Sequence, residues 1–412
     1  MTLRSFSLTS TARPVSSGSV HLDAVRGAAA VLVFANHTRA LYFSSVISRT
    51  QPAVNAASTS QTPGTSIEPA NMVTAGGMKL ASEAVIIFFV LSGYLVGGSV
   101  IKSVKQKTWS WKDYMTKRLT RLWVPLIPCL LICVTLDRTG SRIFGEGSIY
   151  HNPIGIDLIT SFDLAHRIDL ATFFGNAFFL QGILVEYLGT DVSLWSLTNE
   201  FWYYIAFPCV VLALGQGRRH LALRLLYLLL AVAVLVFTGS RIAILFPIWL
   251  FGVIISMIPQ SLSSQRARSL SLLALPVLLF CMVAVRFLPL ETLIEEYVVG
   301  FIASAFIYLL IQQKDTALPS LYQTIARFFS QISYTLYIVH LPVAIFLAAS
   351  INSPWHQWQK TPKNLALFLA LDGLVLGCAT LLCRLFEANT GTIRRRMCAS
   401  PQRILFKSKD LT

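Results

Sequence analysis

Long apolar runs alternate with short polar segments along almost the whole chain of 412 residues. Each run has roughly 17 to 22 residues, enough for a helix to cross a hydrocarbon core about 30 Å thick. The pattern predicts an all-α fold: a polytopic membrane helix bundle with about ten transmembrane helices. By hydropathy we place the spans at residues 22–44, 80–101, 119–136, 194–214, 222–238, 242–258, 271–288, 297–313, 329–350 and 364–386.

Composition narrows the class of protein further. Hydrophobic residues make up 54% of the chain and charged residues only 13%, about half the charged share of an average soluble domain, which excludes a soluble globule. The formal net charge of +15 would suggest nucleic-acid binding in a soluble protein, but here the excess lies in loops beside the spans. The seven cysteines lie mostly inside spans without metal-ligand spacing. We predict no nucleic-acid partner, no disulfide framework and no metal site.

The placement of Lys and Arg predicts the orientation, because basic loops stay in the cytoplasm. Basic residues gather at 102–121, at 218–224 and in the C-terminal tail, whereas acidic residues follow the third span and precede the eighth. We therefore expect a multi-pass inner (plasma) membrane protein with both termini in the cytoplasm. The expected parts are a cytoplasmic tail (1–20), a membrane domain (21–388) with external loops at 45–79 and 137–193, and a basic cytoplasmic tail (389–412).

Residues 171–188 do not fit a simple count of spans. The segment is apolar enough to form another helix, but a full crossing there would move the basic residues at 218–224 to the outer side. We therefore interpret it as a re-entrant or interfacial segment on the outer face, packed against protein so that its backbone is hydrogen-bonded.

Two polar side chains of the first span are expensive to bury in a membrane, which favours a function for them. Arg26 and His37 are eleven residues apart, so they share a helix face and are separated by about 16 Å along the axis. A guanidinium near the cytoplasmic end could hold phosphates, and an imidazole deeper in the bundle could take a proton from a hydroxyl. The alternatives are an interfacial anchor for Arg26 and a structural hydrogen bond for His37.

The second span carries Glu83 near its outer end and the sequence FFVLSGYL, with Gly93 and Gly97 at four-residue spacing. Small residues at this spacing let helix backbones approach closely, so helix packing is the first interpretation of the motif. Glu83 is either directed at an acceptor substrate or paired with a cation.

A basic and aromatic stretch, residues 109–125, precedes the third span. Trp and Tyr among Lys and Arg are typical of an interfacial amphipathic helix that lies on anionic headgroups. Lys117, Arg118 and Arg121 also lie within about one helical turn, where they could clamp a phosphorylated donor instead.

The fourth span begins with LWSLTNEFWYY, in which the carboxylate of Glu200 needs a partner or a proton. Trp195 and Asn199 beside it are candidates for contact with a sugar. In the ninth span, Tyr334 and His340 lie on one helical stripe together with Tyr337. This stripe is either a polar wall of the same cavity or a structural hydrogen-bonded patch.

These motifs occur in the order found in the acyltransferase-3 family of integral membrane O-acyltransferases, which the chain resembles over roughly residues 20–390. The resemblance rests on LDAVRG followed by a histidine at R-x10-H spacing, and on FFVLSGYL, KRLTRLWVP, LWSLTNEFWYY and SYTLYIVHLPV. The family has ten membrane helices with cytoplasmic termini, which agrees with the arrangement expected above. A glycine common before the second motif is replaced here by Ser82-Glu83-Ala84, which leaves the role of Glu83 open.

The resemblance implies a donor, acyl-CoA (acetyl-CoA first), used from the cytoplasm without a permanently bound cofactor. The acyl group would pass to a hydroxyl of a glycan, glycolipid or small molecule at the outer face of the bilayer. His37 matches the family's essential histidine and Arg26 its paired arginine. Arg118 and Arg121 match the basic positions after the second helix, and Glu200 matches the acid of the tryptophan-serine-leucine motif. Direct transfer and an acyl-enzyme intermediate both stay open.

Two other classes of membrane protein compete with this interpretation. A secondary transporter of an anionic solute would also place polar residues in its spans, but transporters usually show related halves with paired interrupted helices, and we find none. A scaffolding protein would not need Arg26, His37 and Glu200 within the hydrocarbon.

Overall fold

The structure is a computed structural model that describes residues 17–43, 79–151, 164–215, 220–285, 291–313 and 318–398. The expected loop at 45–79 and most of both expected tails lie outside these ranges. In the part described, ten helices are long and apolar enough to cross a membrane, and no strand is present. The predicted all-α fold class and number of spans are confirmed.

The described chain folds into helices of very different lengths, several of them interrupted by short 3-10 or π segments. In chain order they are α1 (Ser17–Tyr42), α2 (Lys79–Ser92), η3 (Gly93–Gly97), α3 (Gly98–Lys105), α4 (Trp111–Phe144), α5 (Leu164–Arg167), α6 (Leu170–Ala177), η4 (Val192–Leu194), α7 (Trp195–Leu214), α8 (Leu221–Thr238), α9 (Ser240–Met257), α10 (Ser264–Ala284), α11 (Thr292–Ile311), α12 (Ser320–Ile351), α13 (Pro362–Leu385), η6 (Glu387–Asn389) and α14 (Thr390–Cys398).

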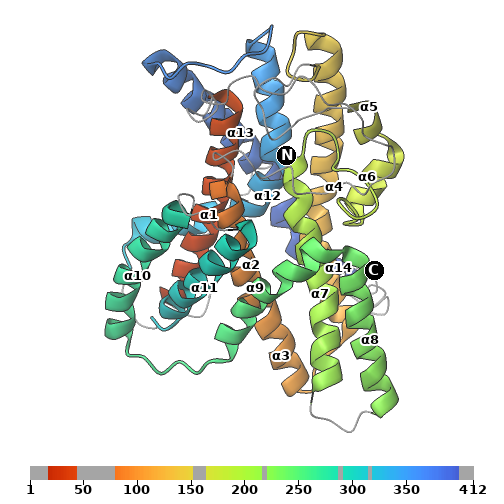
Figure 1. Cartoon of the computed structure of the whole chain (residues 1–412), viewed down its shortest axis with the longest axis vertical. Coiled ribbons are helices and arrows are strands. Elements are labelled where there is room, and N and C mark those ends of the chain that lie inside the picture. The colour runs from red at the N-terminus through yellow and green to blue at the C-terminus, as the bar shows by residue number, and fades with distance from the viewer. Residues whose placement is uncertain are drawn as a thin grey trace, which may run out of the picture.

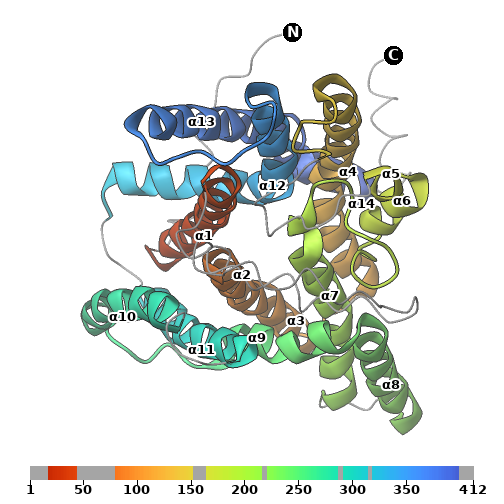
Figure 2. The ribbon, with the colours of Figure 1, turned by 45° about the horizontal axis from the view of Figure 1, so that its top comes forward.

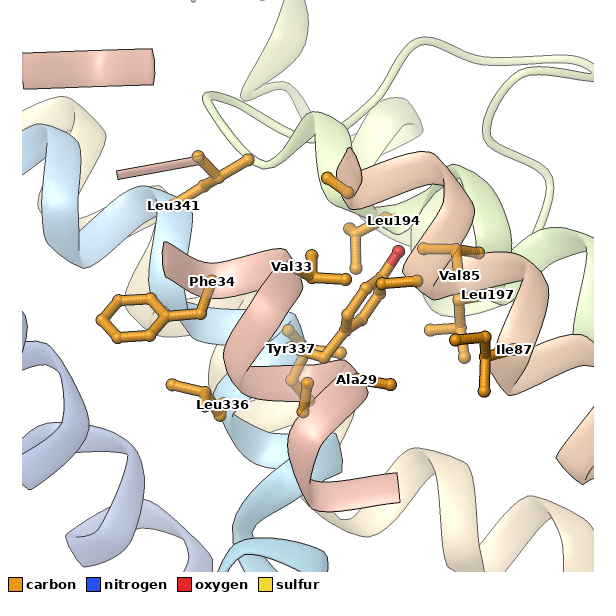
Figure 3. Packing of buried hydrophobic residues seen from close by; sticks show 14 of the residues in the cluster. Ala29, Val33, Phe34, Val85, Ile87, Leu194, Leu197, Leu336, Tyr337 and Leu341 are labelled. Carbon is orange, nitrogen blue, oxygen red and sulfur yellow. The ribbon is translucent and has the colours of Figure 1, made fainter. Parts of the chain in front are cut away.

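The centre of the bundle is α12, which packs along α1 and also contacts α4 and α13. On the other side α1 contacts α2, and α2 in turn contacts α9 and α11 (Figures 1 and 2). Ala29 and Val33 of α1 face Tyr337 of α12 in this core (Figure 3). By contrast, α8 lies at the edge of the bundle beside α7 and is apolar and mostly exposed, as expected of a lipid-facing helix.

Close helix contacts explain the glycines of the second span. A Cβ atom on Gly93 would lie 1.9 Å from the carbonyl oxygen of Trp249, and one on Gly97 would lie 2.5 Å from the Val253 side chain. The facing Gly252 has the same property, since its Cβ would lie 1.9 Å from the carbonyl oxygen of Val90. The predicted packing role of Gly93 and Gly97 is confirmed, and α9 is the helix that they contact.

The basic and aromatic stretch does not form a separate interfacial helix. It is the first part of α4, a single helix of 34 residues. The Ser110 hydroxyl caps this helix by accepting from the backbone N–H of Asp113 at 3.3 Å, and the next residue that could interrupt it, Pro125, is tolerated inside the helix. The third span therefore begins earlier than hydropathy placed it, and its basic residues project from a membrane-crossing helix.

The segment 171–188 forms α6 followed by turns, and it is not among the ten candidate spans. Eight residues of α6 rise only about 12 Å. The indole N–H of Trp123 donates to the carbonyl of Ala177 at 2.8 Å, and that of Trp202 donates to the carbonyl of Phe179 at 2.9 Å. The segment is thus attached to α4 and α7, and its depth in the bilayer stays a prediction.

Candidate functional site

A cavity of about 180 Å³ lies between α1, α2, η3, α4, α7 and α12. Apolar side chains of α2, η3, α4 and α7 form part of its wall. Its polar and charged lining consists of Arg26, Ser92, Arg118, Arg121, Ser196, Glu200, Tyr204, Ser333, Tyr334 and Tyr337. Five of these residues, Arg26, Arg118, Arg121, Glu200 and Tyr334, were candidate site residues in the sequence.

Three cations and one carboxylate line this cavity, but the cations are not equivalent. Arg121 forms an ion pair with Glu387, a buried residue of η6. The hydroxyl of Thr335 donates to the second carboxylate oxygen of Glu387 at 2.5 Å, so both oxygens of this carboxylate are hydrogen-bonded. The guanidinium of Arg121 also lies 5.6 Å from the centre of the Tyr334 ring. Sequence reasoning missed Glu387, which looked like part of a helix end before a basic tail.

Arg118 is held by aromatic rings. Its guanidinium carbon lies 5.7 Å from the ring centres of both Tyr114 and Tyr204, a cation–π arrangement that leaves the positive charge unneutralised. The Tyr114 hydroxyl donates to the carbonyl of Tyr204 at 3.0 Å, which fixes one of the two rings. Arg118 forms no ion pair within the described residues. The cavity wall thus presents a cation that is available to an anionic ligand.

Glu200 is at the end of a directed chain of hydrogen bonds. The indole of Trp249 donates to the hydroxyl of Ser92 at 3.2 Å, Ser92 lies 3.3 Å from the hydroxyl of Tyr204, and Tyr204 donates to Glu200. Because Tyr204 gives its single hydroxyl hydrogen to Glu200, Ser92 must be the donor to Tyr204, so both hydroxyls point toward the carboxylate. Ser92 of the FFVLSGYL motif therefore has a role in the cavity wall, which the packing interpretation alone did not predict.

Tyr337 lies at the boundary between the cavity and a second polar group. Its hydroxyl donates to the carbonyl of Ser193 at 2.6 Å and therefore accepts from the hydroxyl of Ser196 at 2.6 Å. Figure 3 shows this ring extending from α12 toward Leu194 of η4 and Leu197 of α7. The ring centre lies 6.2 Å from that of His340, so the cavity and the histidines share this side chain.

His37 and His340 form a buried pair. Nδ1 of His37 lies 2.8 Å from Nε2 of His340, and the rings stack with centres 5.1 Å apart. Nδ1 of His340 lies 3.1 Å from the carbonyl of Leu336 and 2.9 Å from that of Tyr337. Carbonyl oxygens only accept, so this nitrogen carries a hydrogen.

The two carbonyls therefore decide the tautomers of both rings. With both rings neutral, Nε2 of His340 has a lone pair and accepts from Nδ1–H of His37. The remaining nitrogen of His37, Nε2, then has the free lone pair. The imidazole of His37 is thus held in one tautomer, because its partner His340 is itself fixed by the carbonyls of Leu336 and Tyr337.

Four other candidate residues do not line the cavity. Lys117 is exposed, because it lies about 100° around α4 from Arg118. Trp195 packs its ring edge on Phe89 with centres 6.1 Å apart, while Asn199 and Glu83 are buried elsewhere in the bundle. No group of three or more His, Cys, Asp or Glu in the described part is placed to hold a metal ion.

Fold and site together define a polytopic helical membrane protein with a cationic cavity that adjoins a buried imidazole pair. Residues 20–384 match the family model of the acyltransferase-3 family, described as an acyltransferase domain, and the chain belongs to this family.

Two curated relatives give more distant matches. An O-acetyl transferase of Shigella phage Sf6 is 28% identical over 179 residues, covering 43% of this chain and 47% of the phage protein. An uncharacterized protein of Haemophilus influenzae is 27% identical over 160 residues, covering 37% of this chain and 58% of that protein. The chain thus spans about half the length of the curated relatives it matches. No solved structure matches it.

Proposed function

We propose that the protein is a membrane O-acyltransferase that moves an acyl group, acetyl first, from cytoplasmic acyl-CoA to a hydroxyl of a glycan or glycolipid at the outer face. The observation that carries this proposal is the contact between the cationic cavity and the histidine pair through Tyr337. A phosphorylated donor needs cations, and transfer to a hydroxyl needs a base. The name of the phage relative supports acetyl as the group transferred.

The donor phosphates belong at the arginines. Guanidinium groups form paired, charge-assisted hydrogen bonds with phosphate oxygens. Since Glu387 neutralises Arg121, Arg26 and Arg118 supply most of the free positive charge of the cavity. The Lys and Arg residues at the end of α3 and the start of α4 support an orientation with this side of the cavity toward the cytoplasm, where acyl-CoA is found.

His37 is the general base in this proposal. Its Nε2 takes the proton of the acceptor hydroxyl while the oxygen attacks the thioester carbonyl. The C–S bond then breaks, the CoA thiolate leaves, and His37 returns the proton to the sulfur. During this step the charge on His37 is stabilised by its Nδ1–H bond to His340, whose own N–H is bonded to two carbonyls.

Direct transfer fits the serines of the cavity better than an acyl-serine intermediate does. A serine nucleophile needs an adjacent base. Ser92 and Ser196 are bonded to tyrosines, and Ser333 donates to the carbonyl of Ser330 at 2.8 Å. None of these hydroxyls contacts His37 or His340 in the described structure, so we propose that the acceptor itself attacks the thioester.

The test uses purified protein in detergent with radiolabelled acetyl-CoA and follows thioester loss, label on protein and label on added glycan acceptors. His37→Ala should lower turnover by about 10²- to 10⁴-fold, the usual contribution of a general base, with donor KM little changed. His356→Ala is the matched control, because His356 is exposed and far along the chain from α1. Full turnover by His37→Ala would contradict the base assignment, and label retained on wild-type protein would contradict direct transfer.

A further inference from the structure

A second hollow of about 550 Å³ lies between α3 and α9. Tyr94, Gly98, Ile101, Lys102, Lys105 and Ser256 are among the residues that line it. Leu95 lines both this hollow, the α3–α9 groove, and the cationic cavity described above. The two spaces are therefore separated by one side chain.

The π-helical segment η3 explains why one residue can line both spaces. Its five residues, Gly93–Gly97, interrupt the helix that continues as α3. A π segment shifts the register of the side chains that follow it, and such segments are frequent at functional sites. As a result Ser92 and Val96 line the cavity, Tyr94 lines the groove, and Leu95 is 40% exposed between them.

A close helix contact lies in the lining of the groove. A Cβ on Gly98 would lie 3.0 Å from the Cβ of Ser256, so α3 and α9 almost touch there and only small residues fit. Gly98 and Ser256 both line the groove, so this contact is part of its wall.

The charge of the groove is positive. Lys102 and Lys105 are exposed, lie three positions apart on one face of α3, and form no ion pair within the described residues. Lysines at a helix C-terminus also stabilise the helix dipole, which is their simplest structural role. Their position in the lining of a groove that meets the cavity also makes their charge available to an anionic ligand.

The combined length of the two spaces matches a long ligand. Lys105 lies thirteen positions after Ser92 in the chain, a rise of about 20 Å along a helix. A ligand that spans them needs an anionic end at the lysines and, beyond it, a thin flexible arm that can pass Leu95 into the cavity. Acyl-CoA has this form, with a phosphate monoester on its ribose, a diphosphate and a pantetheine arm.

We propose that the α3–α9 groove binds the nucleotide end of the acyl-CoA donor and that Lys102 and Lys105 bind its ribose phosphate. This inference rests on the proposed function and adds a recognition site to it. The diphosphate, on the same ribose, then lies between the lysines and the arginines, and the pantetheine arm passes Leu95 into the cavity with its thioester toward Tyr337 and the histidine pair. The ligand chemistry, a phosphate monoester, could also come from an anionic lipid headgroup.

The experiment compares acetyl-CoA with acetyl-dephospho-CoA, which lacks only the ribose phosphate. For the wild-type protein in detergent, donor KM should be on the order of tenfold higher for the dephospho donor, the effect of one hydrogen bond between charged groups. The Lys102→Ala/Lys105→Ala double variant should lose this difference and show the higher KM with both donors. Lys112→Ala, which removes an exposed lysine at the start of α4, should keep the full difference.

Each other outcome identifies what is wrong. Equal KM for both donors in the wild type would overturn the groove assignment and leave the acyltransferase activity standing. No turnover with either donor would overturn the proposed function and the groove together. A lysine effect that occurs only in nanodiscs containing anionic lipid, and is the same with both donors, would assign the lysines to a lipid headgroup and overturn the proposal.

Discussion

The two polar regions of this bundle use their hydrogen bonds differently. In the histidine pair, both nitrogens of His340 and Nδ1 of His37 are bonded inside the protein, and both residues are buried. In the cavity, Arg118 has aromatic neighbours and no ion pair within the described residues, while Arg121 is paired with Glu387. The first region is arranged to hold one ring in one state. The second region keeps charge available for a ligand that arrives and leaves.

This difference predicts that substitutions in one region will change mainly kcat and that substitutions in the other will change mainly donor KM. Changes at the histidines should act on the chemical step, and changes at the arginines on donor binding. The largest loss is expected for His37→Ala, followed by the variant of its partner, His340. A histidine variant that changed mainly donor KM, or an arginine variant that changed mainly kcat, would contradict this division.

His340→Gln should lower kcat roughly 10- to 100-fold, a part of the 10²- to 10⁴-fold that a positioned general base contributes. The glutamine amide can turn either its oxygen or its NH₂ group toward His37 and is not fixed by the carbonyls of Leu336 and Tyr337, so the tautomer of His37 is no longer decided, while Nε2 of His37 stays in place. Donor KM should change less than threefold by comparison with wild type. The measurement is steady-state kinetics with acetyl-CoA, together with the pH dependence of kcat, which should shift only if His340 acts through His37.

An unchanged kcat and pH profile for His340→Gln would show that His340 is a structural residue. The exposed His220→Gln provides the matched control for imidazole replacement. If donor KM rose instead of kcat falling, His340 would belong to the binding region and the division between the two regions would be wrong.

Arg118→Ala should raise donor KM about tenfold with little change in kcat, because one charge-assisted phosphate contact contributes on the order of 1.5–3 kcal/mol. Arg121→Ala should also raise donor KM, and it should lower thermal stability as well, because it leaves the buried carboxylate of Glu387 without its partner. Lys117→Ala is the control, because Lys117 is next in sequence to Arg118 but exposed outside the cavity lining. Equal effects for Arg118→Ala, Arg121→Ala and Lys117→Ala would mean that this part of α4 anchors the helix in the membrane and does not bind the donor.

The sequence alone was sufficient to predict the ten spans, because the length of an apolar run decides whether a helix can cross the membrane. Its motifs also predicted several residues that line the cavity. It could not separate Lys117 from Arg118, since the packed face of α4 depends on its neighbours. It also could not pair Arg121 with Glu387 or His37 with His340, because 266 and 303 residues separate the partners. Contacts of that kind are set by the order of helices in the bundle, and hydropathy carries no information about it.

Glu387→Gln should lower donor KM by about threefold and leave kcat nearly unchanged. The amide keeps the shape of the side chain but removes the charge that balances Arg121, so the cavity becomes more attractive to phosphates. Thermal stability should fall at the same time, because a buried ion pair loses one charge. Glu146→Gln, at an exposed position, is the control for charge; a rise in donor KM would mean that Glu387 positions Arg121 instead.

The smallest effect on activity is expected for two carboxylates outside the membrane spans, Asp191 before η4 and α7 and Asp169 before α6. Asp191 is buried and accepts from the Ser193 hydroxyl at 2.5 Å, and burial raises the pKa of Asp191 to about 8. The folded protein therefore binds a proton more tightly than the unfolded chain does. Its contribution to stability is full below about pH 4, the unfolded pKa, and is lost as pH rises through about 8.

Asp169 has the opposite sign. It is exposed and caps α6, and hydrogen bonds from Thr172 lower the pKa of its carboxyl, so its contribution is present above about pH 4 and lost in acid. Thermal unfolding in detergent at pH 5 and pH 9 should therefore show Asp191→Asn gaining much more stability relative to wild type at pH 9 than at pH 5. Asp169→Asn should lose a little at both pH values. A gain for Asp191→Asn that is equal at pH 5 and pH 9 would contradict a protonated Asp191 in the folded protein. The carbonyl of Ser193 accepts from Tyr337. The variant should therefore change kcat with the same pH dependence only if ionisation of Asp191 displaces Ser193.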